Sequence, residues 1–588
     1  MQAAQIVPLR RLPADHEVLD YLVPAGRSVT LGQVVTIPLR LRQQRGVVWG
    51  LSTGTAQPRL RPLGRAHDLV LTDWQRQVSR VMSEQGATSL GHILATVIPS
   101  ETSRRSAKLT TNRHRVRMKP GSFPVGLTWW YRQRGECLTW IAAWVSATNR
   151  PRIILTPTID DAHQIHDHLQ TLGFSGYVIH ADLTPAAYRR LYQQVALDQT
   201  PIVIGTLRAL TLPFHRPPSM LIDQEEHPAH KQTARHPRLD ARRVAQQLDG
   251  QTVATSPAPS IGWYAAHRPT PPSDSRSRQV TWLRSPGSRR WLSGQTVDAL
   301  TQALADHRPA VCITPRRGFA RSIDCGDCGW MYTCPNCHQP LAMSQARVRQ
   351  SHCRFCGHTS TLPDQCPRCQ GHHWSFHGLG PEQLVQEIGQ QWPRALAVPL
   401  TDPKIAADVF VGSYRAYRLL PDLRNLATII LISGDSLLNV PDYSSAERAW
   451  QYLNRLQAAA PETPLIVQTF DPDHEFWQRW LAHDDYHWYQ AELETRRRLG
   501  LPPSTEQWIA HYRGADAAVR GQTMLARLQR LRVAGLEVHS LTQQATDRIP
   551  TTRLLLSMSP GQLARRVPWR QWFDLPWQLD TSPASWLD

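Results

Sequence analysis

Eight of the chain's ten cysteines are concentrated in one short stretch and fall into four CxxC pairs. The pairs are Cys325/Cys328, Cys334/Cys337, Cys353/Cys356 and Cys366/Cys369. Each CxxC places two thiolates one ligand edge apart, and two such pairs complete a tetrahedral Cys₄ shell. The array therefore fits two structural zinc ions, with no coordination position left open for catalysis. Four disulfides in a secreted module are the alternative, which is disfavoured because CxxC loops are short and the start of the chain carries no export signal.

Length and composition set broad limits on the rest of the chain. Its 588 residues leave room for about three to five domains, each with its own core. No apolar run approaches the length of a membrane span, so we expect a soluble, cytoplasmic chain whose cysteines stay reduced. The net charge of +19 favours a polyanionic partner, although an arginine excess of this kind also arises from genome base composition.

The order of apolar runs predicts an α/β multidomain fold. A small β-rich domain comes first, and two blocks of alternating strands and helices follow, which is typical of parallel sheets with crossover helices. The cysteine array interrupts the second block directly after its first strand. The predicted divisions are a β-rich domain at 1–103, a basic linker at 104–127, a first lobe at 128–264, a linker at 265–290, a second lobe at 291–480 with the insertion at 325–370, and an α/β C-terminal domain at 481–588.

Two tandem lobes with a basic surface are typical of nucleic-acid motors, which need a phosphate-binding loop. Such a loop supplies glycine N–H groups and a lysine that directly follows a glycine. None of the four lysines in this chain follows a glycine. The segment Arg132–Thr139, before the first helix of the first lobe, has one glycine, no lysine and a carboxylate that would repel phosphate. Conventional ATP hydrolysis is therefore not expected, and we predict that the chain is not an enzyme.

The segment Met220–His227 places carboxylates directly after an apolar strand. Motors hold Mg²⁺ and polarise water with carboxylates in this position. Without a phosphate loop to deliver a nucleotide, we expect Asp223 and Glu225 to be solvated acids at a strand end. They would then be remnants of a nucleotide site.

Several separated motifs resemble the PriA family of primosomal replication-restart helicases. They are the cysteine array with its lead-in Pro315–Phe319 and the segments LDYLVPAG, ILTPTIDDAHQ, IVIGTLRALTLPF, DQEEHPAHKQ, GDSLLNVPDYSSAERAWQYL, VQTFDPDH and YQAELETRRRLGLPP. The resemblance covers nearly the whole chain in the family's order. It implies a 3′-DNA-binding domain, two RecA-like helicase lobes, a two-zinc module within the second lobe and a C-terminal domain.

The resemblance also implies ligands and partners. One zinc would be held by Cys325, Cys328, Cys366 and Cys369, and the other by Cys334, Cys337, Cys353 and Cys356. The implied partners are forked and single-stranded DNA, other primosome proteins and the loader of the replicative helicase. ATP and Mg²⁺ are not expected as cofactors, because the family's phosphate loop is missing.

Other family features are altered as well. The winged-helix domain that usually follows the first domain is missing from the expected interval, which holds only the basic linker. The arginine-finger segment corresponds to Leu456–Pro461, and the glycine-rich segment to Gly412–Arg418. The acid box reads Asp223-Gln224-Glu225-Glu226, with its second acid and its histidine changed. These departures predict a member of the family that has lost helicase activity.

Four residues are candidate DNA contacts because of the resemblance. Asp20 and Tyr21 correspond to a pair that lines a pocket for the terminal 3′ nucleotide, where a carboxylate accepts from a base edge and a ring stacks. The alternative is an ordinary strand-to-turn pair. Arg40 replaces a glycine near that pocket, and Lys231 lies where the family couples DNA to the ATP site, so an electrostatic role is expected.

We therefore expect a replication-restart protein that binds stalled or abandoned forks and promotes primosome assembly and replicative-helicase reloading, without helicase activity. Two alternatives stay open. One is an active ATP-dependent 3′–5′ DNA helicase with a non-standard phosphate loop. The other is a zinc-ribbon scaffold that binds proteins and not DNA.

Overall fold

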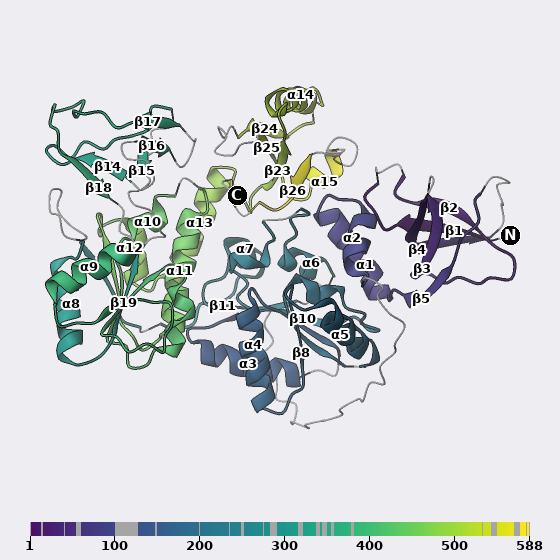
Figure 1. Cartoon of the computed structure of the whole chain (residues 1–588), viewed down its shortest axis with the longest axis horizontal. Coiled ribbons are helices and arrows are strands. Elements are labelled where there is room, and N and C mark those ends of the chain that lie inside the picture. The colour runs from purple at the N-terminus through teal and green to yellow at the C-terminus, as the bar shows by residue number, and fades with distance from the viewer. Residues whose placement is uncertain are drawn as a thin grey trace.

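Five structural parts follow one another along the chain (Figure 1). The computed structural model describes residues 2–12, 16–39, 42–53, 60–99, 128–147, 150–198, 200–233, 236–248, 252–274, 276–282, 291–314, 322–336, 341–343, 350–353, 358–377, 381–440, 442–531, 533–541, 550–567, 569, 577–583 and 585–586. No helix within these ranges has both the length and the apolar character needed to cross a membrane. The predicted basic linker at 104–127 lies outside the described residues.

The N-terminal domain is an antiparallel sheet with both faces covered. Its strands are β1 (Gln2–Pro8), β2 (Leu19–Val23), β3 (Gln33–Leu39), β4 (Arg42–Thr53) and β5 (Ala66–Val70), in the spatial order β2-β1-β4-β3-β5. β-Branched residues fit such a pleated surface, and Ile6, Val35 and Val48 close one face. Val34 and Val47 point to the other face, where they pack against helix α2.

Helices α1 (Asp73–Gln85) and α2 (Leu90–Val97) connect this sheet to the next part of the chain. A capping box between Thr72 and Gln75 starts α1. The indole Nε1 of Trp74 donates to the carbonyl of Leu210 at 2.8 Å, and Gln75 Nε2 donates to the carbonyl of Thr211 at 2.9 Å. The N-terminal sheet is therefore docked on the first lobe through α1.

Lobe 1 is a parallel sheet covered by helices on both faces. Its strands are β6 (Thr128–Trp130), β7 (Arg152–Leu155), β8 (Tyr177–Ile179), β9 (Ile202–Gly205), β10 (Ser219–Ile222) and β11 (Val253–Ser256), in the order β6-β11-β10-β7-β9-β8. Its helices are α3 (Arg134–Ser146), α4 (Ile159–Thr171), α5 (Pro185–Leu197), α6 (Ala241–Leu248) and α7 (Ile261–His267). Apart from Arg152 and Ser219 at their starts, the central strands β7, β9 and β10 are apolar, as expected of parallel strands buried on both faces.

Lobe 2 has the same construction. Its strands are β12 (Arg278–Trp282), β13 (Ala310–Thr314), β19 (Ala397–Pro399), β20 (Val409–Ser413), β21 (Thr428–Leu431) and β22 (Leu465–Thr469), in the order β12-β22-β21-β13-β20-β19. Its helices are α8 (Gly294–Ala305), α9 (Pro381–Gln391), α10 (Asp435–Leu438), α11 (Ser445–Ala459), α12 (Glu475–Leu481) and α13 (Asp485–Arg498).

Two smaller parts complete the chain. The cysteine module follows β13 and contains the pair β14 (Ser322–Cys325) and β18 (Trp374–His377) and the three-stranded sheet β15 (Leu341–Met343), β16 (Gln350–Cys353) and β17 (Thr359–Thr361). The C-terminal domain contains β23 (Glu506–Arg513), α14 (Ala517–Arg530), β24 (Glu537–Ser540), β25 (Thr551–Met558), α15 (Leu563–Arg566) and β26 (Gln578–Asp580). Figure 1 shows this domain above lobe 1 and beside α2.

Buried ion pairs join the two lobes. Arg132 of lobe 1 contacts the Asp485 carboxylate of lobe 2 at 2.6 Å and lies 3.6 Å from Asp274 in the connecting segment. The side chains of Asp274 and Asp485 are each 1% exposed. Trp450 donates its indole N–H to Asp485 at 3.0 Å. Because ions this deep are tolerated only when paired, the facing surfaces of the lobes fix each other's position.

The predicted fold class is confirmed, but two divisions differ from those predicted. β12 falls inside the predicted linker 265–290 and is an edge strand of the lobe 2 sheet. Its arginine-rich sequence looks like a linker, yet Arg278 is buried because Asp274 neutralises it. α13 was predicted in the C-terminal domain, whereas its Trp488 and Tyr489 pack into the lobe 2 core.

The ion pairs between the lobes predict that replacing Asp485 lowers the stability of the protein more than replacing the adjacent Asp484. Asp485→Ala would leave the Arg132 guanidinium buried without its closest carboxylate, which should cost about 3–5 kcal/mol of stability. Asp484→Ala is the matched control, since Asp484 caps α13 and contacts the exposed His487 imidazole 2.8 Å away, so its loss should cost about 1 kcal/mol. Chemical denaturation of both variants measures the difference, and equal losses would contradict the role of the buried pair.

Candidate functional site

Four cysteine sulfurs converge beside the β14–β18 pair. They belong to Cys325, Cys328, Cys366 and Cys369, and their Sγ atoms all lie within 4.8 Å of one another. The Cys325 and Cys369 sulfurs are 3.5 Å apart, and those of Cys328 and Cys366 are 3.8 Å apart. The structure thus brings together the first and last CxxC pairs, which the family resemblance had assigned to one metal ion.

Both of these CxxC pairs fold into the same turn. In each, the residue four positions after the first cysteine donates its N–H to that cysteine's carbonyl at 2.8 Å. These residues are Gly329 and Gln370, with φ of 70° and 60°. The left-handed turn reverses the chain so that both thiols of a pair face one centre. Four thiolates so placed can hold one metal ion as a closed set.

The second predicted set is only partly described. Cys334 and Cys353 are buried and pack around Leu341 of β15. Cys337 and Cys356 lie outside the described residues. A second metal ion held by these four cysteines stays a prediction.

The acid box lies at the carboxyl end of β10. Arg134, in the first turn of α3, makes two parallel hydrogen bonds of 2.6 and 2.8 Å to the Asp223 carboxylate. Thr255 at the end of β11 adds a third, from Oγ1 at 2.8 Å. Burial disfavours the charged carboxylate, but Arg134 and Thr255 outweigh it, so the pKa of Asp223 lies below its ordinary value. Both oxygens of Asp223 are thereby engaged by protein groups.

Glu225 and Glu226 have partners of their own. Glu225 accepts from the N–H of Ser260 at 2.9 Å and from its hydroxyl at 2.7 Å. Burial raises the pKa of Glu225 to about 7, although Arg242 and the Ser260 hydrogen bonds oppose the rise. Glu226 accepts from Arg455 at 3.1 Å, and burial likewise raises its pKa.

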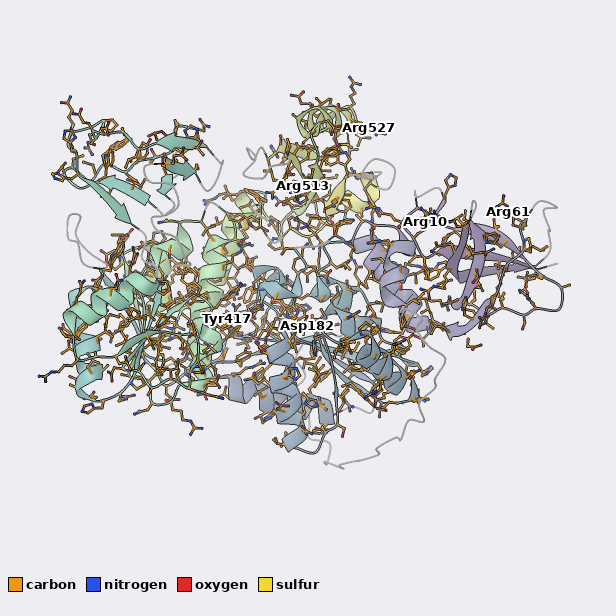
Figure 2. All side chains as sticks on the ribbon, viewed as in Figure 1. Arg10, Arg61, Asp182, Tyr417, Arg513 and Arg527 are labelled. Atoms are coloured by element: carbon orange, nitrogen blue, oxygen red, sulfur yellow. The ribbon has the colours of Figure 1, made fainter. Side chains whose placement is uncertain are left out.

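Arg455 reaches this box from α11 of lobe 2. The same approach of the lobes places the Tyr417 hydroxyl 2.8 Å from Nε2 of His227, and Figure 2 shows Tyr417 between the lobes. Neither Arg134 nor Arg455 was predicted from the sequence to belong to the acid box. That both residues are arginines could have suggested a role, because buried acids need buried cations. The sequence around each arginine, however, does not show which acid it pairs with.

Two expectations about this region are corrected. The acids are not solvated: Asp223 is 0% exposed and Glu225 is 4% exposed. The strand end is enclosed by α3, α7 and lobe 2, which is why each acid requires a partner. The segment Arg132–Thr139 is also mostly helical, because α3 already begins at Arg134.

The predicted DNA contacts of the N-terminal domain lie on opposite faces of β2. Asp20 is exposed, whereas the Tyr21 ring is 4% exposed and packs in the core of the sheet. The Tyr21 hydroxyl donates to the carbonyl of Pro38 at 3.0 Å. Strand alternation separates the two side chains, so the structure does not bring them together. Arg40 lies outside the described residues.

A hollow lined partly by arginines lies near the C-terminal end of β2, beyond Val23. It measures about 530 Å³ and is lined by Arg27, Ser28, Leu63, Gly64, Arg65 and Ala66. Arg27 donates to the carbonyl of Gly64 at 2.6 Å, which holds its guanidinium at the rim. Arg61 is exposed on the same sheet (Figure 2). These residues were not predicted from the sequence, because Arg27 and Arg65 are brought together only by the fold.

Lys231 has a protein partner. Its ammonium group donates to Asp580 of β26 and to the Ser582 carbonyl at 2.7 Å, and the residue is 4% exposed. Burial lowers the pKa of Lys231, while Asp580 opposes that change. In this arrangement the ammonium is engaged by the C-terminal domain rather than turned toward a ligand.

Known proteins resemble this chain over parts of its length. A family model described as the 3′ DNA-binding domain (3′BD) of PriA matches residues 6–99. The replication restart protein PriA of Bacillus subtilis is 27% identical over 70% of this chain and 55% of its own length. The replication restart protein PriA of Rickettsia conorii is 22% identical over 82% of this chain and 83% of its own.

A solved structure of RecG bound to a three-way DNA junction also matches. It has a TM-score of 0.33 and 10% sequence identity, and the match covers 61% of this chain and 42% of that chain. The matched region spans about half the length of the Bacillus subtilis relative.

The expectation that the chain is not an enzyme is contradicted. It was drawn from the missing phosphate loop and arginine finger. Relatives that carry the PriA name match this chain over 70% and 82% of its length, so the missing motifs do not exclude an enzyme role. Missing motifs alone were too narrow a basis for excluding an enzyme. The acid box pairs its carboxylates with Arg134 and Arg455, which no motif had indicated.

The sulfur cluster predicts a metal stoichiometry. Cys366→Ser should abolish the metal ion held by this cluster, because a hydroxyl replaces one of four thiolates in a closed set. Elemental analysis of the purified variant measures the loss. The control is Cys312→Ser, at a buried cysteine of β13 outside the array. Equal metal content in the wild type and Cys366→Ser would contradict the assignment.

The buried Glu225 predicts a pH-dependent stability difference. The pKa of Glu225 rises from 4.5 in the unfolded chain to about 7 in the folded protein. Between these two pH values the unfolded chain has lost this proton and the folded protein still holds it. The stability of the wild type therefore falls as pH rises through this range. Glu225→Gln removes the titration, so its stability relative to wild type should rise by up to about 3 kcal/mol between about pH 5 and pH 8.

Denaturation at each pH measures this difference. The control is Glu537→Gln, because Glu537 is exposed. A Glu225→Gln difference that stays flat with pH would contradict the raised pKa.

Proposed function

Because this chain belongs to the PriA family of replication restart proteins, we propose that it binds stalled or abandoned replication forks and promotes primosome assembly and reloading of the replicative helicase. The N-terminal domain is the contact with the fork, and a free 3′ end is the feature it recognises. The observation that carries this proposal is the match of residues 6–99 to the PriA 3′ DNA-binding domain.

The arginine-lined hollow supports this assignment. Arg27, Arg61 and Arg65 are exposed on one small sheet, and an arginine fork suits the two oxygens of a phosphate. Gly64 lets the lining segment approach β3 closely, since a Cβ there would lie 3.0 Å from the carbonyl oxygen of Thr36. Asp20, exposed on β2, contacts a base edge at the terminal nucleotide, and Arg40 is an added phosphate contact.

The cysteine module serves protein partners in this proposal. Closed sets of four thiolates are typical structural zinc sites, and in this proposal the chain holds two zinc ions, one in each Cys₄ set. Structural zinc supplies about 10 kcal/mol or more of local folding free energy, so the module is a rigid surface built by its metals. Other primosome proteins and the helicase loader dock there. The protein works in the cytoplasm, where these thiols stay reduced.

The 3′-end contact predicts selective loss of fork binding. Arg65→Ala should weaken binding to a fork with a free 3′ end by about tenfold or more, because a charged hydrogen bond to phosphate is lost. It should change binding to blunt duplex far less. Fluorescence anisotropy with both DNAs at fixed salt measures the two affinities.

The matched control for this experiment is Arg497→Ala on lobe 2. That arginine is 71% exposed and pairs only with the neighbouring Glu494. An equal loss on fork and duplex would remove the 3′-end role. Wild-type protein that binds neither DNA at low salt would leave a protein-interaction scaffold as the function.

A further inference from the structure

One short segment near the end of the described residues contacts four parts of the molecule. It consists of residues 577–583 and 585–586, and we call it the clasp. The clasp begins in the C-terminal domain, where β26 pairs with β23 and Leu579 packs in the domain core. After β26 the Thr581 hydroxyl donates to the carbonyl of Gln85 at the end of α1. From this anchored strand the clasp reaches both lobes.

The first half of the clasp binds lobe 1 just after the acid box. The Lys231 ammonium donates to the Asp580 carboxylate, and to the carbonyl and hydroxyl oxygens of Ser582 at 2.7 and 2.8 Å. The side chains of Lys231 and Asp580 are 1% and 2% exposed. Because an ammonium group buried this deeply is costly without its carboxylate, this end of the clasp is firmly attached.

The second half of the clasp binds lobe 2 just before α11. One oxygen of the Asp442 carboxylate accepts from the Ser585 hydroxyl at 2.5 Å and from the N–H of Trp586 at 2.9 Å. The other oxygen accepts from the N–H of Ser444 at 2.9 Å. The ring centroids of Trp586 and Tyr443 are 5.2 Å apart. This end of the clasp is therefore held by hydrogen bonds to one carboxylate and by one aromatic contact.

The Asp442 carboxylate depends on these donors. Asp442 is buried. Burial disfavours its charged form, but hydrogen bonds from Ser444 and Ser585 outweigh burial and hold the pKa of Asp442 below its ordinary value. Loss of the clasp donors would leave this charge with fewer hydrogen bonds, which favours movement of the loop toward water.

The same two regions of the lobes also contact each other directly. Arg455 of α11 pairs with Glu226 of the acid box at 3.1 Å. Glu447, in the first turn of α11, accepts from the N–H of Ile261 at the start of α7 at 2.9 Å. The contacts thus form a closed ring that runs from the acid box to the clasp, on to the loop before α11, and through α11 back to the acid box. In such a ring each contact keeps the partners of the others within reach.

We propose that the clasp is a conformational lock, which holds lobe 2 against the acid box and releases Asp442 before the two lobes separate. The lobe 2 end is the one that opens, because its contacts come from residues that follow β26 and lie outside the sheet. The lobe 1 end includes a buried ion pair beside a paired strand, which is costlier to break. The lock is independent of the DNA-binding function proposed above, because it involves contacts within the chain alone.

Hydrogen exchange at the lobe interface reports the state of the lock. The N–H of Ile261 bridges the lobes through Glu447, so opening of the lobes exposes it to solvent. Ile261 belongs to lobe 1, whereas Ser585 binds a loop of lobe 2. A change in exchange at Ile261 caused by a substitution at Ser585 would therefore be transmitted through the ring of contacts.

The test is hydrogen–deuterium exchange, followed by mass spectrometry, on the whole chain without DNA. Ser585→Ala removes the hydroxyl that donates to Asp442. Exchange of the segment that contains Ile261 should become about tenfold faster, since a hydrogen bond to a charged acceptor is lost. The control Ser559→Ala, at an exposed serine of the C-terminal domain, should leave exchange unchanged. Faster exchange confined to the clasp and the loop around Asp442 would overturn the proposal, because the lobes would then stay together after the clasp is released.

A second variant, Trp586→Ala, covers the case in which the serine variant fails to fold. Trp586 is half-buried, and the change removes its ring contact with Tyr443 and its indole hydrogen bond to Gln507. Exchange near Ile261 should again become faster, while β23 and β25 of the C-terminal domain stay as protected as in the wild type. An unchanged rate near Ile261 would overturn the lock. An equal rise in β23 and β25 would also overturn it, because the C-terminal domain would then be unfolding as a whole.

Discussion

The pairing of buried charges between the lobes is the constraint on which the rest of this structure depends. Arg132 carries its charge into the interface and is matched there by Asp485 and Asp274. A charge of this kind costs several kcal/mol when its partner is removed, so the lobes are held in one relative position. That position in turn brings Arg455 of α11 onto Glu226 of lobe 1. The acid box is therefore completed by both lobes.

The same constraint explains how the acid box is built. A motor leaves a carboxylate after its apolar strand to hold a metal ion. Here Arg134 supplies the neutralising charge directly, and the two hydrogen bonds to Asp223 hold both carboxylate oxygens. The chain thus has an acid at the end of an apolar strand, with an arginine as its cation. Reading the motifs one by one suggested loss of function, whereas the assembled box shows a substituted set of partners.

Docking of the outer domains follows a related principle. Lys231 and Asp580 are both buried and satisfy each other, and Trp74 inserts its ring into lobe 1 while its indole N–H meets a carbonyl. Each contact removes apolar or charged surface from water and gives the buried polar group a partner. The N-terminal sheet, lobe 1 and the C-terminal domain are consequently held in contact with one another.

The sequence alone determined the features whose physics is local. Because thiols three residues apart share a turn, the CxxC array predicted a metal-binding module. Apolar runs of strand length likewise predicted two parallel sheets. Tertiary structure decided everything that joins distant residues. Arg134 and Asp223 are 89 positions apart, and Lys231 and Asp580 are 349 apart. Asp20 and Tyr21 are adjacent, yet strand alternation turns them to opposite faces. The reason is the same throughout: a charge or ring acquires its role from what the fold buries beside it, and that neighbour cannot be read from local spacing.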